Sequence, residues 1–287
     1  MTCKMILNSA DADFAARFTA LQSMKREQAA DVHADVAAII EAVQTDGDDA
    51  LIALTAKFDR LDLTTTPMQV SAAEIDAAEK ACAPETRAAL DTAARRIADF
   101  HARQKPDDNR FTDDAGVELG HRWTPVDAAG LYVPGGLANY PSSALMNALP
   151  ARVAGVERVT MVVPTPDGVI NPLVLAAAKR AGVDEIFRIG GAQAIAALAY
   201  GTQTIDPVNV IVGPGNAYVA AAKKQVFGQV GIDMIAGPSE ILVVADAHND
   251  PAWIAADLMS QAEHDAVAQA VLICDSTEFA DAVVAAV

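Results

Sequence analysis

The sequence predicts a doubly wound α/β fold, and three observations predict it. From about Leu131 onward, short runs rich in Val and Ile alternate with Ala-rich segments at helical spacing. These short runs are apolar throughout, which is typical of parallel strands that are covered on both faces. The composition is 52% hydrophobic and 21% charged over 287 residues, which is ordinary for a folded α/β protein and enough for two domains.

Helices are predicted for the first hundred residues. Asp31 to Val43 carries apolar residues at helical spacing, and Asp46-Gly47-Asp48 ends this pattern. Ser71 with Glu74 three residues later forms a capping box at the start of a second helix. The N-terminal part is therefore predicted to be a helical region that precedes the strands.

A further helix is predicted to begin at Pro84 and to end before Pro106. Residues 105–116 (KPDDNRFTDDAG) are polar and rich in turn-forming residues. We expect them to form a linker or loop.

Strands and helices then alternate to the end of the chain. The predicted strands are 159–163, 185–189, 208–212, 241–245 and 271–274. The predicted helices are 172–180, 194–200, 218–226, 253–259 and 279 onward. The last helix reaches Val287 without a capping residue. An open α/β sheet normally has further strands, so we expect the last domain to be incomplete and the chain to be a fragment.

The formal net charge of −17 argues against two classes of partner. Nucleic-acid binders carry basic patches, and anionic membrane surfaces attract basic segments. Solubility alone explains the acidic balance. We therefore expect neither nucleic acid nor membrane as a partner.

The cysteines and the N-terminus indicate a cytoplasmic protein. Cys3, Cys82 and Cys274 are far apart, odd in number and in no metal or redox spacing, which fits a reducing compartment. The first residues lack the long apolar stretch of a signal peptide, and no apolar run reaches the roughly 18 residues of a membrane span.

The hexamer Ser260–Asp265 (SQAEHD) closes the predicted helix near Met259. Gln261 and His264 are three residues apart, so they share one face of a helix. Imidazole is a common zinc ligand, whereas a Gln carbonyl is a rarer and weaker one. This is half a metal site at most, because zinc needs about four ligands. On spacing alone, a polar helix C-terminus is the favoured interpretation.

Three glycine-rich turns adjoin predicted strands, two of them after a strand and the third, at Gly237, before one. They are Gly190–Gln193, Gly213–Asn216 and Gly237–Glu240. Ligands of doubly wound folds bind beyond the carboxyl ends of the strands, where glycines allow close approach to backbone N–H groups. A ligand cleft and simple tight turns are about equally supported. The dinucleotide fingerprint GxGxxG is absent, so an ordinary Rossmann site is only weakly indicated.

A fourth glycine-rich loop, Leu131–Gly136, carries Tyr132. This tyrosine can stack on a planar ligand, or it can be a core or rim residue. The sequence favours neither interpretation.

Six stretches, in this order, resemble the histidinol dehydrogenase family: GLYVPGG, YPSSALMNALPARVAGV, GGAQAIAALAYGT, GPGNAYV, DMIAGPSEILVVAD and AADLMSQAEHD. They run from about residue 130 to 265, and the N-terminal helices also resemble the start of the family. The resemblance covers essentially the whole chain.

The resemblance implies oxidation of L-histidinol to L-histidine through histidinaldehyde, the last step of histidine biosynthesis. Two NAD⁺ act in succession, and one zinc per subunit holds the substrate amine and imidazole. It implies NAD binding by Tyr132, Gln193 and Asn216. It implies substrate binding by Ser239, Gln261 and His264, of which Gln261 and His264 also match zinc ligands.

The family also implies what this chain lacks. Its members run longer by something like half as much again. The further part carries a Glu–His pair that serves as acid and base, and an Asp and a partner-subunit His that complete the zinc shell. We therefore expect no catalytic residue within this chain, an inactive chain alone, and a homodimer when complete.

The resemblance implies two Rossmann-like domains, one inserted in the other. Residues 1–25 form an N-terminal helical arm. Residues 26–131 and 237–287 form a truncated domain on the zinc and substrate side, and residues 132–236 form the NAD-side domain. Two alternatives stay open, namely a related dehydrogenase of another alcohol, such as a sulfonated diol, and a non-catalytic nucleotide-binding fragment.

Overall fold

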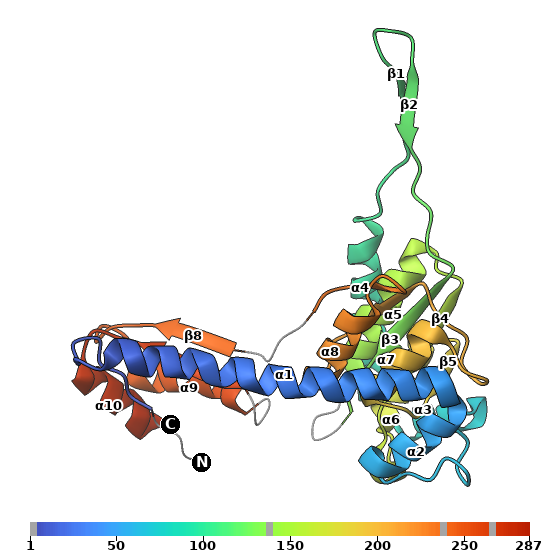
Figure 1. Cartoon of the computed structure of the whole chain (residues 1–287). Helices are drawn as coiled ribbons and strands as arrows, with labels where there is room; N and C mark the ends of the chain where they lie inside the picture. The colour runs from blue at the N-terminus through green and yellow to red at the C-terminus, as the bar shows by residue number, and fades with distance from the viewer. Residues whose placement is uncertain (1–4, 136–139, 236–239, 264–267) are drawn as a thin grey trace. The chain divides into compact units, whose positions relative to one another are not determined.

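A computed structural model describes residues 5–135, 140–235, 240–263 and 268–287. The chain divides into two compact units, Met1–Ile235 and Ala236–Val287 (Figure 1). Ser239 and His264, two of the predicted site residues, lie outside the described residues.

Four helices precede the main sheet. They are α1 (Phe14–Asp46), α2 (Asp48–Asp59), α3 (Ala72–Ala81) and α4 (Pro84–Ala102). The first begins well before the predicted start at Asp31, whereas Gly47 ends it as expected. Gly47 has a φ of +57° and donates its N–H to the carbonyl of Val43 at 2.9 Å. Such a positive φ costs glycine little, which explains the sharp break between α1 and α2.

The predicted capping box is confirmed. The Ser71 hydroxyl accepts a hydrogen bond from the backbone N–H of Glu74 at 3.3 Å, and the Glu74 carboxylate accepts one from the Ser71 N–H at 2.9 Å. Two of the unpaired donors at the start of α3 are thereby satisfied. The helix at Pro84 also begins where predicted, with the proline in its first turn.

The prediction of a linker or loop over residues 105–116 is wrong in part. This segment contributes β1 (Asn109–Thr112), which pairs in antiparallel register with β2 (Glu118–His121). The Asp113 carboxylate accepts the N–H groups of Ala115 and Val117, both at 2.9 Å, and so folds the turn. Every residue of both strands is exposed, so no apolar alternation signalled them.

The central sheet of the first unit has five parallel strands in the order β5-β4-β3-β6-β7. The strands are β3 (Ala128–Tyr132), β4 (Arg158–Val162), β5 (Glu185–Phe187), β6 (Val210–Val212) and β7 (Gly231–Ile232). The connections contain α5 (Pro141–Ala154), the short η1 (Pro166–Gly168), α6 (Pro172–Arg180), α7 (Gly191–Tyr200) and α8 (Ala217–Val226). The chain builds outward from β3 to β5 and then returns to the other side of β3, which confirms the predicted α/β class with a parallel sheet.

Two cores lie on the two faces of this sheet. Alternate residues of β3 belong to different cores, because successive side chains of a strand point to opposite faces. Ala129 and Leu131 pack with α5 and α6, against which α4 and α3 lie. Ala128 and Tyr132 belong to the core that α7, α8 and α1 cover. The N-terminal helices therefore complete the outer layers on both faces (Figure 1).

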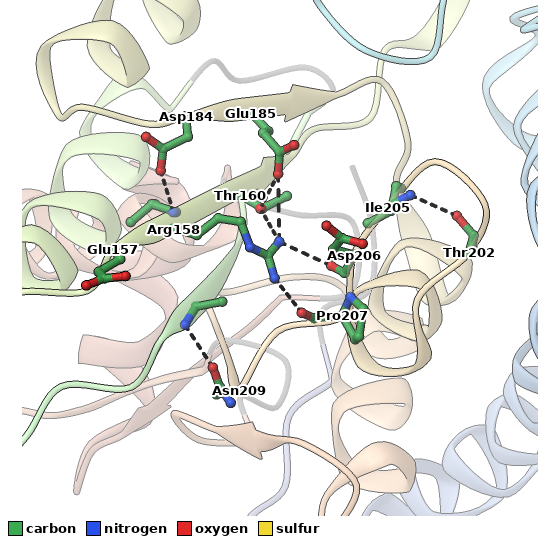
Figure 2. Close-up of polar contacts among 12 residues, drawn as sticks. Glu157, Arg158, Thr160, Asp184, Glu185, Thr202, Ile205, Asp206, Pro207 and Asn209 are labelled. Carbon is green, nitrogen blue, oxygen red and sulfur yellow. Dashed lines mark hydrogen bonds and ion pairs between the residues drawn. The ribbon is translucent and has the colours of Figure 1, made fainter.

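The amino edge of the sheet is closed by hydrogen bonds around Arg158 (Figure 2). Its guanidinium donates to the carbonyls of Pro207 at 2.6 Å and Asp206 at 3.3 Å, and to the Thr160 hydroxyl at 3.2 Å. Thr160 in turn donates to the Glu185 carboxylate at 3.0 Å. These bonds tie β4 to β5 and to the loop before β6, so this edge is engaged in structure.

The second unit contains β8 (Glu240–Val244), α9 (Pro251–Ala262), β9 (Gln269–Ile273) and α10 (Thr277–Ala286), with the two strands parallel. Both helices pack with the same sheet face, which carries Ile241 and Val243. On the opposite face Leu242 and Val244 are 60% and 72% exposed. The predicted pairing of 26–131 with 237–287 as one domain stays a prediction.

In the described part of the chain, no helix is both long enough and apolar enough to cross a membrane.

Candidate functional site

The carboxyl edge of the five-stranded sheet carries the three residues predicted to bind NAD. Tyr132 is the last residue of β3, Gln193 lies in the first turn of α7 after β5, and Asn216 is the N-cap of α8 after β6. Because all five strands are parallel, these positions lie at one edge. The strand order reverses between β3 and β6, and this is where doubly wound folds bind ligands.

Tyr132 is a core residue with a polar tip. It is 4% exposed, and its hydroxyl accepts a hydrogen bond from the backbone N–H of Gly191 at 3.1 Å. Burial raises the pKa of Tyr132 to about 12. Of the two open interpretations, the structure shows the ring in the core, while the hydroxyl reaches the turn at the start of α7.

The turn before α7 depends on glycine. Gly191 has a φ of +62°, and a Cβ there would lie 2.8 Å from the side-chain oxygen of Gln193. Gln193 is 2% exposed, and its side-chain amide makes no hydrogen bond to the other residues that the structure describes. A nearly buried amide with unused donors and acceptor fits a polar ligand at this edge.

The turn after β6 lies against β3. Gly213 has a φ of +113°, and a Cβ there would lie 2.2 Å from the backbone oxygen of Tyr132. The Asn216 side-chain oxygen accepts the N–H groups of Tyr218 and Val219, both at 3.1 Å. Asn216 is therefore a helix cap in this structure, which is a structural role that the glycine pattern did not reveal.

An ion pair between a buried lysine and an exposed aspartate beside this turn was not predicted. Lys223, in the last turn of α8, is 2% exposed and forms an ion pair with Asp233, which follows β7. The neighbouring Lys224 is exposed. In the sequence, only the apolar spacing of the helix distinguishes these two lysines.

Asp59, at the end of α2, lies near the turn that follows β4. It is 7% exposed, and one of its carboxylate oxygens has no hydrogen-bond partner among the described residues. Burial raises the pKa of Asp59, while the backbone N–H of Thr165 acts in the opposite direction. The Thr165 hydroxyl is also buried, and no other residue that the structure describes forms a hydrogen bond with it. Polar groups left unpaired in this way are costly, and they gather near Tyr132, whose pKa the Asp59 charge also raises.

The predicted zinc and substrate residues are described only in part. Gln261 is half-buried in the last turn of α9. No group of three or more His, Cys, Asp or Glu side chains that could hold a metal occurs in the described ranges. The zinc and substrate roles of Gln261 stay predictions, as do those of Ser239 and His264.

Comparison with known proteins gives one consistent family. The family model described as histidinol dehydrogenase matches residues 22–287. The histidinol dehydrogenase of Rhodospirillum rubrum is 66% identical over 281 residues, which are 98% of this chain and 65% of that protein. The histidinol dehydrogenase of Rhizobium meliloti is 64% identical over 281 residues, which are 98% of this chain and 65% of that protein.

A solved structure is similar as well. The crystal structure of histidinol dehydrogenase from Elizabethkingia anophelis matches with a TM-score of 0.76 and 40% identity, covering 88% of this chain and 58% of that one. The chain thus spans just under two thirds of the length of these curated relatives, which are longer, as the resemblance implied. A match to the family model over nearly the whole sequence assigns the chain to the histidinol dehydrogenase family.

Proposed function

We propose that this chain is part of an enzyme that oxidises L-histidinol to L-histidine through histidinaldehyde, with NAD bound at the carboxyl edge of its first unit. The observation that carries the proposal is the convergence of Tyr132, Gln193 and Asn216 on that edge, at the switch point between β3 and β6. Membership of the family supplies the reaction class.

The residues at this edge suit an anionic dinucleotide. The backbone N–H groups of Ala192 and Gln193, in the first turn of α7, make no hydrogen bond to other described residues. Free N–H groups at a helix N-terminus attract phosphate oxygens. Gly190 lets the start of α7 pack closely against Pro164, because a Cβ there would lie 2.4 Å from that side chain. When bound, NAD⁺ accepts the hydride that leaves the alcohol carbon.

In this proposal each part of the edge has its own task. Gln193 offers its buried amide to the ligand, and the first turn of α7 holds the phosphates. Tyr132 fixes the position of that turn by accepting the Gly191 N–H. Asn216 orients the start of α8. The GxGxxG fingerprint is not needed in this proposal, because two separate turns, Gly190–Gln193 and Gly213–Asn216, would supply the close backbone approach.

The zinc and substrate side is proposed from the family resemblance. Zinc would hold the substrate amine and imidazole, with Ser239, Gln261 and His264 contributing from the second unit. The described residues supply only Gln261 of this set, so they do not form a metal site by themselves. No step of the reaction is assigned through the metal. A homodimer and a cytoplasmic location complete the proposal.

The test is calorimetric titration of NAD⁺ into the 287-residue chain. We expect saturable binding that is weakened by Gln193→Ala and by Asn216→Asp. The second variant keeps an oxygen that can cap α8, but it adds a negative charge to the edge where the anionic dinucleotide is proposed to bind. Gln229→Ala, at an exposed position before β7, is the matched control. Absence of binding, or equal binding by all four proteins, would contradict the NAD site.

A second assay addresses catalysis. The resemblance places the acid–base pair outside this chain, so we expect no L-histidinol-dependent rise in NADH absorbance, with or without added zinc. Measurable turnover, or stoichiometric zinc that resists a chelator, would show that the roles carried over from the family are mistaken.

A further inference from the structure

We propose that Lys223 and Asp233 are positioning residues that clamp Gly213 and so hold the Gly213–Asn216 turn in its nucleotide-binding shape. The proposal rests on the proposed NAD site. It assigns a task to an ion pair between buried Lys223 and exposed Asp233, neither of which is among the predicted binding residues.

The clamp is a closed ring of hydrogen bonds around one residue. The Lys223 ammonium donates to the carbonyl oxygen of Gly213 at 3.0 Å and to one carboxylate oxygen of Asp233. The other carboxylate oxygen of Asp233 accepts the N–H of Gly213 at 2.8 Å. Both backbone polar groups of Gly213 are thus held by the two charged side chains, which also hold each other.

The ring joins three elements at the switch point. Gly213 follows β6 directly, Lys223 comes from α8, and Asp233 follows β7. The backbone N–H of Asp233 donates to the carbonyl of Ile211 in β6 at 3.2 Å, and that of Met234 donates to the Asp233 carboxylate at 2.6 Å. One bond holds the backbone of Asp233 and the other holds its carboxylate, so the position of the carboxylate is fixed.

The position of Gly213 makes its restraint consequential. Glycine adopts its φ of +113° at little cost. Its Cα lies so close to the end of β3 that a Cβ would be 2.2 Å from the backbone carbonyl oxygen of Tyr132. A small rotation of this residue would move the start of the turn that ends in Asn216. Gly213 is also the residue at which the chain leaves β6, beside β3. The rotation would therefore move the turn after β6 away from the end of β3, at the point where the strand order reverses.

Stability alone is a weak reason for such a pair. Burying Lys223 requires its desolvation, and the attraction of Asp233, whose side chain is 31% exposed, is weakened by solvent. Geometry is the better explanation, because an ammonium and a carboxylate together satisfy one acceptor and one donor of the same backbone residue. An apolar pair could fill the space but could not orient Gly213.

The experiment compares Lys223→Met and Asp233→Asn with two controls. Lys224→Met removes the exposed lysine next along α8, and Asp206→Asn removes an exposed carboxylate from the same unit. Two readouts are taken on the full chain, below the melting temperature of every variant. One is amide hydrogen exchange of a peptide that covers residues 210–218, and the other is the calorimetric Kd for NAD⁺.

We expect both clamp variants to exchange faster over this peptide and to bind NAD⁺ about tenfold more weakly or worse, as loss of charged hydrogen bonds implies. The controls should match the parent chain in both readouts. Asp233→Asn serves as the milder variant if Lys223→Met fails to fold, because an Asn oxygen can still accept the Gly213 N–H.

Three results would overturn the proposal or its basis. Unchanged exchange in a folded clamp variant would show that the pair does not restrain the turn. Faster exchange with an unchanged Kd would show a restraint without a positioning role. If the parent chain binds no NAD⁺, the proposed NAD site fails and the nucleotide role with it, while the exchange data still decide whether the pair clamps Gly213.

Discussion

The Tyr132 hydroxyl oxygen lies 3.1 Å from the backbone nitrogen of Gly191 and accepts its hydrogen bond. The last side chain of β3 thereby satisfies one of the N–H groups that a helix leaves unpaired at its start. The contact joins two residues that are 59 positions apart in the chain. It fixes the beginning of α7 relative to the central strand of the sheet.

Replacing Tyr132 by Phe tests this contact. The ring of Tyr132, which is 4% exposed, would keep its place in the core, but the N–H of half-buried Gly191 would lose its partner. We expect a loss of about 1–3 kcal/mol of stability in urea denaturation, and weaker NAD⁺ binding. Tyr218→Phe is the control, because Tyr218 is 38% exposed on α8. Equal stability of Tyr132→Phe and the parent chain would contradict a structural role for the hydroxyl.

The raised pKa of Tyr132 predicts a loss of stability in alkali. An unfolded tyrosine loses its proton near pH 10, whereas burial raises the pKa of folded Tyr132 to about 12. The contribution is fully present below pH 10 and is lost as pH rises through 12, because ionisation then favours the unfolded chain. Two pKa units correspond to about 2–3 kcal/mol.

The measurement is a difference titration of tyrosinate absorbance between the parent chain and Tyr132→Phe, with denaturation curves at the same pH values. Four tyrosines are present in the sequence, so the difference isolates one of them. A midpoint near 10 for the missing tyrosine would show that the Tyr132 hydroxyl is open to water.

Much of the carboxyl edge of the five-stranded sheet was predictable from the sequence, because its strands and turns are determined by neighbouring residues. Strand runs and glycine turns are written in consecutive residues, so the sequence located Gly190–Gln193 and Gly213–Asn216 after their strands. The Lys223–Asp233 pair and the Tyr132–Gly191 contact join segments that only the sheet brings together. The exposed hairpin over residues 109–121 escaped prediction, because its strands lack a buried face.

Gly213→Ala should be strongly destabilising, for two separable reasons. Alanine would have to adopt a φ of +113°, and its Cβ would lie 2.2 Å from the backbone carbonyl oxygen of Tyr132. Gly228→Ala is the control, since its φ is +106° but nothing lies within 4 Å of the added Cβ. We expect the control to cost about 1–2 kcal/mol for the backbone conformation alone, and Gly213→Ala to lower the melting temperature clearly further. Similar losses in both variants would mean that the turn can move away from β3.

Two aspartates close together in sequence should respond oppositely to amidation. Burial raises the pKa of Asp59, so its ionised form opposes folding and its contribution falls as pH rises through that pKa. Hydrogen bonds from the hydroxyl and backbone N–H of Thr64 hold the pKa of Asp62 below its usual value, so its contribution is present above that value and is lost in acid.

We therefore expect Asp59→Asn to raise the melting temperature at pH 7, with a gain that shrinks toward pH 4. Asp62→Asn should lower the melting temperature at pH 7 or leave it unchanged. Differential scanning calorimetry at several pH values measures both variants. A lower melting temperature for Asp59→Asn at pH 7 would show that the buried carboxylate is stabilised by partners that compensate its burial.

The second unit should associate with itself through the open face of β8. Ile241 and Val243 point to the face that α9 and α10 cover, whereas Leu242 and Val244 are 60% and 72% exposed. Parallel strands are normally covered on both faces, and exposed apolar strand surfaces favour association. We expect the double variant Leu242→Lys, Val244→Lys to shift the chain toward monomer in light scattering at unchanged melting temperature. Val243→Ala, on the covered face, should instead lower the melting temperature and leave association unchanged. A parent chain that is monodisperse and monomeric at high concentration would contradict this prediction, because the apolar face would then have no tendency to find a second copy.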